Sequence, residues 1–212
     1  MYKSLAEICQ RTEETGLPFW KIVQQEDCCE QGISEEKSFD FMRRMYAAMK
    51  ESDQNYDGKL KSASGLVGTE GAKLHERIAS GKMVSGDFMS VVMEKALKVA
   101  ESNACMKRIV AAPTAGSCGV VPAVFLSAQE KFGFAEDRVV EALYVAAGIG
   151  GVIASRAFLA GAEGGCQAEI GSASAMAAGG MTYLLGGNAQ EICQASALAL
   201  KGLLGLACDP VA

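Results

Sequence analysis

Two cysteines, Cys166 and Cys208, are the residues whose surroundings point most directly to chemistry. Each lies in a stretch rich in glycine and alanine, GGCQAEIGS for the first and GLACDPVA for the second. Neither stretch contains a histidine, and the spacing of the two cysteines matches no zinc-binding pattern. Because cysteine thiolates are the usual ligands of iron in iron-sulfur sites, an iron-sulfur centre is the hypothesis to test. Burial in the core is the competing interpretation, since free cysteine is commonly buried.

A second candidate site is the small-residue stretch APTAGSCGVVP at residues 112–122, which leads into an apolar segment. Backbone N–H groups at the start of a helix are unpaired and lie at the positive end of the helix dipole, so they attract anions. The glycines let a ligand approach the backbone closely, and the hydroxyl groups add donors. We therefore expect a substrate carboxylate to bind here. The residues expected to bind it are Thr114, Ala115, Gly116 and Ser117.

The elements that must position these residues are predicted to be helices. Apolar residues recur at helical spacing along most of the chain, and Ser4, Ser34 and Ser85 are suited to cap three of the helices. The pattern predicts a first helix from Ser4 to before Gly16, a second that starts at Pro18, and a third from Ser34 to before the loop at 53–58. Further helices are predicted over about 85–103, 122–132, 136–159, 168–185 and 189–204. Only residues 108–112 suggest extended chain. The predicted fold class is mainly α, a compact bundle of apolar, Gly/Ala-rich helices with glycine-rich loops.

The chain shows neither a fixed-period repeat nor a convincing linker, so a single catalytic domain over 1–212 is expected. Within it, the more polar helices of about 1–105 are predicted to surround an apolar core of about 106–212. Two uncharged stretches, 109–129 and 170–190, are long enough to raise the question of a membrane span. Their prolines and glycines favour buried helices instead, so no membrane association is expected.

The composition excludes some classes of partner. The net charge is -5 and the sequence pI is about 5.1, with no Lys/Arg cluster larger than Arg43-Arg44 or Lys107-Arg108. This balance argues against nucleic-acid binding. The eight cysteines are too sparse for a disulfide-rich scaffold, and residues 1–7 lack the apolar run of a signal peptide, so a reducing cytoplasm is expected.

Three segments carry a family resemblance: 113–122, 163–178 and 202–212. They closely resemble the α subunit of the bacterial iron-sulfur L-serine dehydratases, and the match runs through the whole chain in order. The loop SASGLVG at 62–68 and Lys73 also fit this family.

The resemblance implies a lyase that deaminates L-serine to pyruvate and ammonia, with a [4Fe-4S] cluster held by three cysteines and a β subunit that completes the active site. It places Cys166 and Cys208 among the cluster ligands and the third ligand beyond Ala212. A chain that ends at Ala212 is therefore expected to lack the usual C-terminal segment, to hold no stable cluster, to leave the thiols of Cys166 and Cys208 free or disordered, and to be inactive alone. Homo-oligomerisation is left open.

Elimination from serine needs help at two atoms, because the α-proton is weakly acidic and hydroxide is a poor leaving group. A metal ion with an open coordination position can assist the departure of hydroxide, while a protein base must take the α-proton. The base is unassigned among Ser64, Lys73, His75, Glu169 and Ser172. Glu169 can either orient the substrate ammonium or serve a structural role. His75, the single histidine, is interpreted as a solvated helix residue.

Four further cysteines, Cys9, Cys193, Cys105 and Cys118, are interpreted as structural, although Cys118 lies inside the candidate anion-binding stretch.

Two rival functions remain. One rival is a pyridoxal-phosphate dehydratase, for which strands should alternate with helices. The other is a non-catalytic helical subunit or fragment that binds a partner through its apolar second half.

Overall fold

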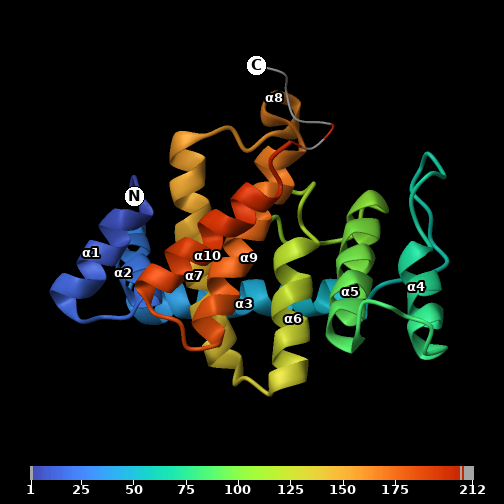
Figure 1. The fold of residues 1–212 in the computed structure, drawn as a ribbon, viewed down its shortest axis with the longest axis horizontal. Coiled ribbons are helices and arrows are strands. Elements are labelled where there is room, and N and C mark those ends of the chain that lie inside the picture. The colour runs from blue at the N-terminus through green and yellow to red at the C-terminus, as the bar shows by residue number, and fades with distance from the viewer. Residues whose placement is uncertain (1, 206, 208–212) are drawn as a thin grey trace.

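The computed structural model describes residues 2–205 and 207, and over this range it is helical, as predicted (Figure 1). No strand occurs among these residues, so the alternation expected of the pyridoxal-phosphate rival is not found in them. The described helices are α1 (Leu5–Thr15), α2 (Phe19–Gln31), α3 (Glu35–Gln54), α4 (Glu70–Ala79), α5 (Asp87–Ala104), α6 (Val120–Phe132), α7 (Glu136–Arg156), α8 (Gly161–Cys166), the π-turn η1 (Gln167–Gly171), α9 (Ser172–Leu184) and α10 (Ala189–Gly202).

Two of the three predicted serine caps are confirmed. The hydroxyls of Ser4 and Ser34 accept the backbone N–H groups of Glu7 and Lys37, at the starts of α1 and α3. The prediction for Ser85 is wrong, because α5 begins one residue later with Gly86 as its cap. Gly86 has φ +73°, a conformation that favours glycine, and the Ser85 hydroxyl bonds to that of Ser90 instead.

The expected helix over 168–185 begins differently from the prediction. The π-turn η1 precedes α9, so residues 167–171 are wound more loosely than an α-helix. Helix α6 starts at Val120 rather than Pro122, which places the proline in the first turn, where its missing N–H costs no intrahelical bond. Residues 108–112 pair with no strand in the described part of the chain.

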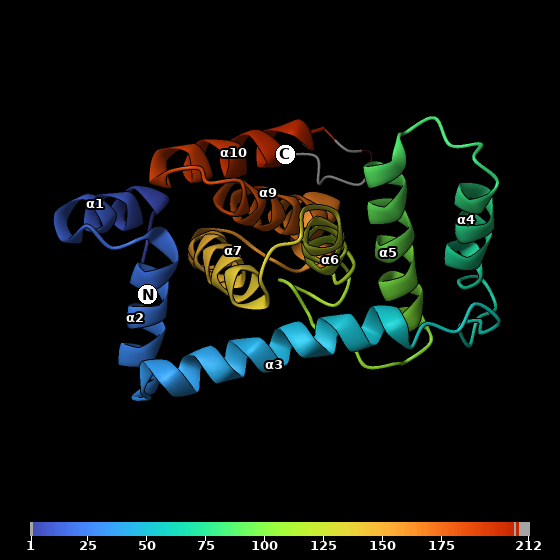
Figure 2. The same ribbon diagram turned by 90° about the horizontal axis from the view of Figure 1, so that it is seen from below.

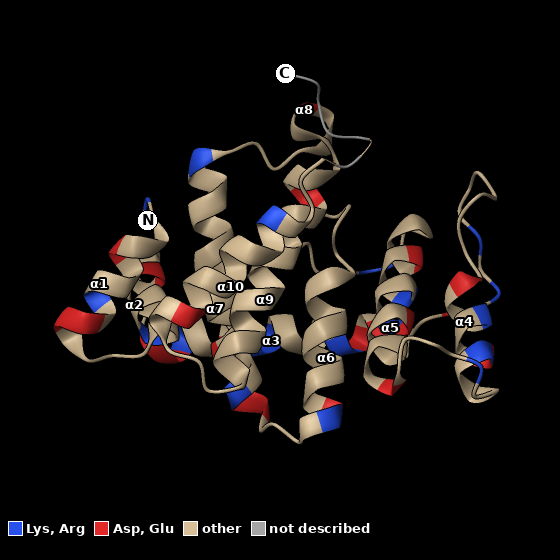
Figure 3. Cartoon of the chain, in the orientation of Figure 1, with Lys and Arg blue, Asp and Glu red and all other residues tan. Residues whose placement is uncertain are grey.

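The centre of the molecule is built around α9, which packs against α6, α7 and α10 (Figures 1 and 2). Helix α9 contains no charged residue, and Figure 3 shows charges mainly on the surrounding helices. Its glycines let the neighbouring helices approach closely, because a Cβ atom on Gly180 would lie 2.2 Å from Phe125 Cζ of α6. The core also includes Ile8, Phe19 and Tyr46 from the first half of the chain. The division into peripheral and core halves stays a prediction.

Helix α7 is the one helix of the described residues whose length and hydropathy would allow it to cross a membrane. In this fold, 56% of its most apolar window is buried by the protein itself. Ten of its residues, including Tyr144, Val145 and Ile149, are buried among the other helices. Such burial is typical of a core helix.

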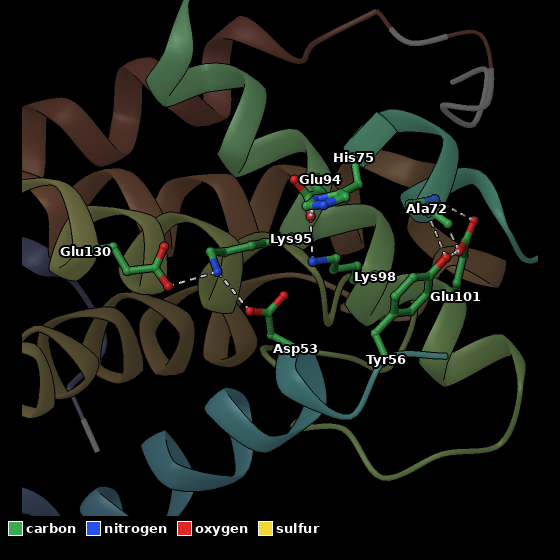
Figure 4. A network of polar contacts seen from close by, with 10 residues as sticks. Asp53, Tyr56, Ala72, His75, Glu94, Lys95, Lys98, Glu101 and Glu130 are labelled. Carbon is green, nitrogen blue, oxygen red and sulfur yellow. Dashed lines mark hydrogen bonds and ion pairs between the residues drawn. The ribbon is translucent and has the colours of Figure 1, made fainter. Parts of the chain in front are cut away.

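A buried ion pair fastens α5 to the rest of the bundle (Figure 4). Lys95 Nζ of α5 lies 2.8 Å from Asp53 Oδ2 of α3 and 2.9 Å from Glu130 Oε1 of α6. Burial lowers the pKa of Lys95, but the hydrogen bonds to the two carboxylates outweigh burial and raise the pKa above its usual value. The lysine therefore stays charged and holds three helices together.

The close contact at Gly180 predicts that Gly180→Ala destabilises the protein. Overpacking a core typically costs about 1–3 kcal/mol, which exceeds the gain of about 1 kcal/mol from replacing a helical glycine by alanine. Urea unfolding measures the change. Gly202→Ala is the matched control, since a Cβ there meets nothing within 4 Å. Equal stability of the two variants would contradict the proposed packing.

The buried position of Lys95 predicts that Lys95→Met lowers the free energy of unfolding by about 3 kcal/mol, because removing one partner leaves the other charge buried and uncompensated. Thermal and urea unfolding measure this loss. Lys73→Met is the control. Lys73 and its partner Glu70 are mostly exposed, and exposed pairs contribute at most about 1 kcal/mol. A change at Lys95 no larger than that at Lys73 would refute the role of the buried pair.

Candidate functional site

The 113–119 loop connects the end of α5 to the start of α6 and is held by contacts to α5. Asn103 Nδ2 donates to the carbonyl of Ala115 over 3.0 Å. Gly119 lies directly against the α5 backbone, since a Cβ atom on it would be 2.5 Å from Ala96 O. Ala115 and Gly116 remain exposed, and their backbone N–H groups have no acceptor among the described residues. These two N–H groups are the ones available to an anion.

The two hydroxyls expected to bind the anion are engaged within the protein. Thr114 Oγ1 donates to a carboxylate oxygen, Glu169 Oε1, over 2.8 Å. Ser117 is 1% exposed, and its hydroxyl lies 3.4 Å from the carbonyls of Ala112 and Thr114. A hydroxyl has only one hydrogen to donate, so both side chains fix the loop in this structure. Direct binding of a carboxylate by the loop stays a prediction.

Cys166 lies at a break between two helical segments. Gly165, with φ +67° and ψ -167°, interrupts the helix just before it, and the π-turn η1 follows. π-Turns are rare and occur frequently at functional sites. The expectation of a free thiol at Cys166 is wrong, because its sulfur is bonded in a disulfide. A sulfur in this state must be reduced before it can ligate a metal as thiolate.

The 113–119 loop and the π-turn η1, which follows Cys166, meet at Glu169. Besides the bond from Thr114, the carboxylate is flanked by two glycines. A Cβ atom on Gly116 would lie 2.4 Å from Glu169 Oε2, and one on Gly161 would lie 3.0 Å from it. Two segments far apart in the chain are thereby joined at one carboxylate. The start of α6, α8 and the end of α10 all face this end of the molecule (Figure 1).

The same turn contacts the last helix through Gln167. Its Nε2 donates to the carbonyl of Leu200 near the end of α10, over 2.7 Å. A Cβ atom on Gly171 would lie 2.2 Å from Gln167 Oε1, so the glycine makes room for this side chain. This hydrogen bond places the end of α10, which precedes the second cysteine motif in the chain, beside the π-turn that follows Cys166. Cys208 itself lies outside the described residues, and a metal shared with Cys166 stays a prediction.

Two of the other candidate bases lie elsewhere. Lys73 and His75 belong to α4, which packs on α5 on the side away from α6 (Figures 1 and 2). The hydrogen bond from Lys73 to Glu70 raises the pKa of the lysine, which opposes a role as base. His75 Nδ1 lies 3.0 Å from Glu94 Oε1, and the histidine side chain is 66% exposed (Figure 4).

The two serine candidates also differ in position. Ser64 lies in an exposed loop, where its hydroxyl bonds to that of Ser62. Ser172 is 1% exposed at the start of α9. Of the five candidates, Glu169 is therefore the one in contact with the predicted anion-binding loop.

The remaining cysteines have structural surroundings. Burial raises the pKa of the Cys118 thiol to about 11 and that of Cys193 to about 12. Cys9 and Cys193 lie 3.1 Å apart, sulfur to sulfur, between α1 and α10. Cys105 follows the last residue of α5. Among the described residues, no group of three or more His, Cys, Asp or Glu is arranged to hold a metal.

Sequence reasoning missed three residues that shape this site: Asn103, Gly161 and Gln167. Asn103 gave no signal, because its partner Ala115 is defined only by the fold. Gln167 follows Cys166 directly and Gly161 precedes it in the same Gly/Ala-rich stretch. The sequence shows that Gln167 is polar and that Gly161 is small, but it does not show which distant residues they contact.

A family sequence model described as "Serine dehydratase alpha chain" matches residues 14–212. The chain belongs to this family. It is 35% identical over 212 residues to a probable L-serine dehydratase, alpha chain, of Bacillus subtilis, and 38% identical over 217 residues to the L-serine dehydratase, alpha chain, of Peptoniphilus asaccharolyticus. Both alignments cover all of this chain and, respectively, 71% and 73% of the relative.

L-serine dehydratase 1 of Escherichia coli is 33% identical over 216 residues, which cover all of this chain and 47% of that protein. This family member thus corresponds to part of a longer polypeptide in that relative. The term alpha chain in the family description and in two of the relatives' names implies an enzyme made with a second kind of chain.

The contact between the 113–119 loop and η1 predicts that Thr114→Val lowers the free energy of unfolding by about 1.5–3 kcal/mol, because a hydrogen bond to a charged group is lost. Thr114→Ser keeps the hydroxyl and is expected to cost less than about 0.5 kcal/mol. A double-mutant cycle with Glu169→Gln, measured by urea unfolding, isolates the interaction. Additive effects of the two substitutions would show that the side chains do not interact in solution.

Proposed function

We propose that this chain is the α chain of an L-serine dehydratase that converts L-serine to pyruvate and ammonia in the cytoplasm, together with a β chain. The names of the relatives support this activity, and their alignments cover the whole chain. The observation that carries the proposal is the contact between Thr114 and Glu169, because it joins the predicted substrate loop to the π-turn that directly follows Cys166.

A [4Fe-4S] cluster is part of the proposal, and the described residues fit it in part. Cys166 is half-buried at a helix break, where a reduced thiolate would ligate iron. It is the described residue that would hold the cluster, so the other ligands must come from outside the described residues. When bound, the cluster supplies a Lewis acid that assists the departure of hydroxide.

The chain's own residues bind and orient the substrate in this mechanism. The exposed N–H groups of Ala115 and Gly116 are placed to bind the serine carboxylate. Bonds from Thr114, Ser117 and Asn103 keep the loop in position, so little ordering is needed when substrate binds. The base that removes the α-proton is not assigned to a residue of this chain.

The proposal predicts that the chain, produced with its β chain and loaded with iron and sulfide under anaerobic reducing conditions, forms pyruvate from L-serine. Cys166→Ala is expected to lose both pyruvate formation and the visible absorbance of the cluster. Cys29→Ala, at an exposed thiol of α2, is the matched control and should retain both. A Cys166→Ala enzyme with normal activity and absorbance would refute the ligand assignment. Absence of pyruvate from the loaded wild-type enzyme would refute the function.

A further inference from the structure

Glu169 is a half-buried carboxylate without a cationic partner among the residues that the structure describes. Oε1 accepts the hydrogen bond from Thr114, whereas Oε2 accepts no hydrogen bond from the described residues. No described lysine, arginine or histidine lies within ion-pair distance of it. Partial burial of an unpaired charge is unfavourable unless another charge compensates it. The arrangement is suited to a cation that arrives from solution.

Two glycines lie directly against Oε2, which fills the space that a side chain would need at either position. Any side chain at Gly116 would collide with Oε2, and one at Gly161 would crowd it. Gly116 is exposed, so this side of the carboxylate borders solvent. The bond from Thr114 meanwhile fixes the other oxygen and limits rotation of the carboxylate. A small cationic group can therefore reach an oxygen that is already oriented.

We propose that Glu169 binds the ammonium group of the substrate through Oε2, with Thr114 as a positioning residue. This inference rests on the proposed function, since it names the ligand group of that same site. An α-amino acid carries its ammonium and its carboxylate on the same carbon atom. Ala115 and Gly116, with their N–H groups, belong to the loop that contacts Glu169 through Thr114 and Gly116. Opposite charges on the ligand thus meet opposite charges on the protein. A site that bound anions in general would have no use for the carboxylate of Glu169.

The test compares L-serine with 3-hydroxypropionate, which has the same carboxylate and hydroxyl but no ammonium group. Binding of each to the cluster-loaded two-chain enzyme is measured by calorimetry, and the L-serine KM and kcat are measured by pyruvate formation. A hydrogen bond between charged groups is worth about 1.5–3 kcal/mol, so Glu169→Gln is expected to weaken L-serine binding roughly 10- to 100-fold. Binding of 3-hydroxypropionate is expected to be unchanged or tighter, because this anion does not use the contact and its carboxylate is repelled by the charge of Glu169.

Three further variants sharpen the result. Glu169→Asp keeps the charge and should recover part of the L-serine affinity. Thr114→Val should weaken L-serine binding less than Glu169→Gln does, and Thr114→Ser should restore it. Glu163→Gln, at an exposed glutamate of the neighbouring helix α8, is the matched control and should leave the ratio of the two affinities unchanged. Circular dichroism checks that each variant is folded.

Two results would overturn the inference. One is equal weakening of both ligands by Glu169→Gln, which would indicate a structural role. The other is a loss of kcat with unchanged L-serine binding, which would identify Glu169 as the base instead. If the wild-type enzyme forms no pyruvate, the proposed function fails. The comparison of binding still decides whether Glu169 recognises an ammonium group.

Discussion

The close approach of helices to α9 is the constraint on which the rest of the structure depends. Gly179 and Gly180 face Ile149 of α7 and Phe125 of α6 at distances that leave no room for a Cβ atom. Such contacts remove apolar surface from water at three neighbouring helices at once. Because α9 is enclosed on several sides, its N-terminal end has little freedom. The π-turn and Cys166 directly precede that end, so core packing sets where the candidate chemistry lies.

A second set of forces positions the loop on the opposite side of the site. Lys95 fixes α5 between α3 and α6, and Asn103 then extends from the same helix to the 113–119 loop. The loop is thereby attached to α5 at one point and to the π-turn through Thr114 at another. Packed helices that hold a short loop at two points are a suitable support for a binding site, because few residues lie outside rigid elements.

Local signals in the sequence predicted most helices but not their exact ends. The caps at Ser4 and Ser34 depend on N–H groups three residues away, so they could be inferred directly. His75 was interpreted as a helix residue, but the bounds of its helix, α4, were not predicted. The first N–H groups of α4, those of Glu70 and Gly71, donate to the carboxylate of Glu101 in α5 and not to a local cap. The bond between Thr114 and Glu169 is likewise invisible locally, although both motifs were recognised. Contacts between distant segments require the fold.

The position of a carboxylate beside a loop that is predicted to bind an anion is at first sight contradictory. Glu169 lowers the affinity of the loop for a simple anion, because like charges repel over such short distances. In the proposed site, a ligand that carries both charged groups on one carbon atom reverses this effect, since its ammonium is attracted while its carboxylate reaches the backbone N–H groups of Ala115 and Gly116. If the proposed site is correct, the two features together select against anions and against cations, and in favour of a zwitterion. Neither the loop nor the carboxylate alone would give this selectivity, which follows from the fold that places them in contact.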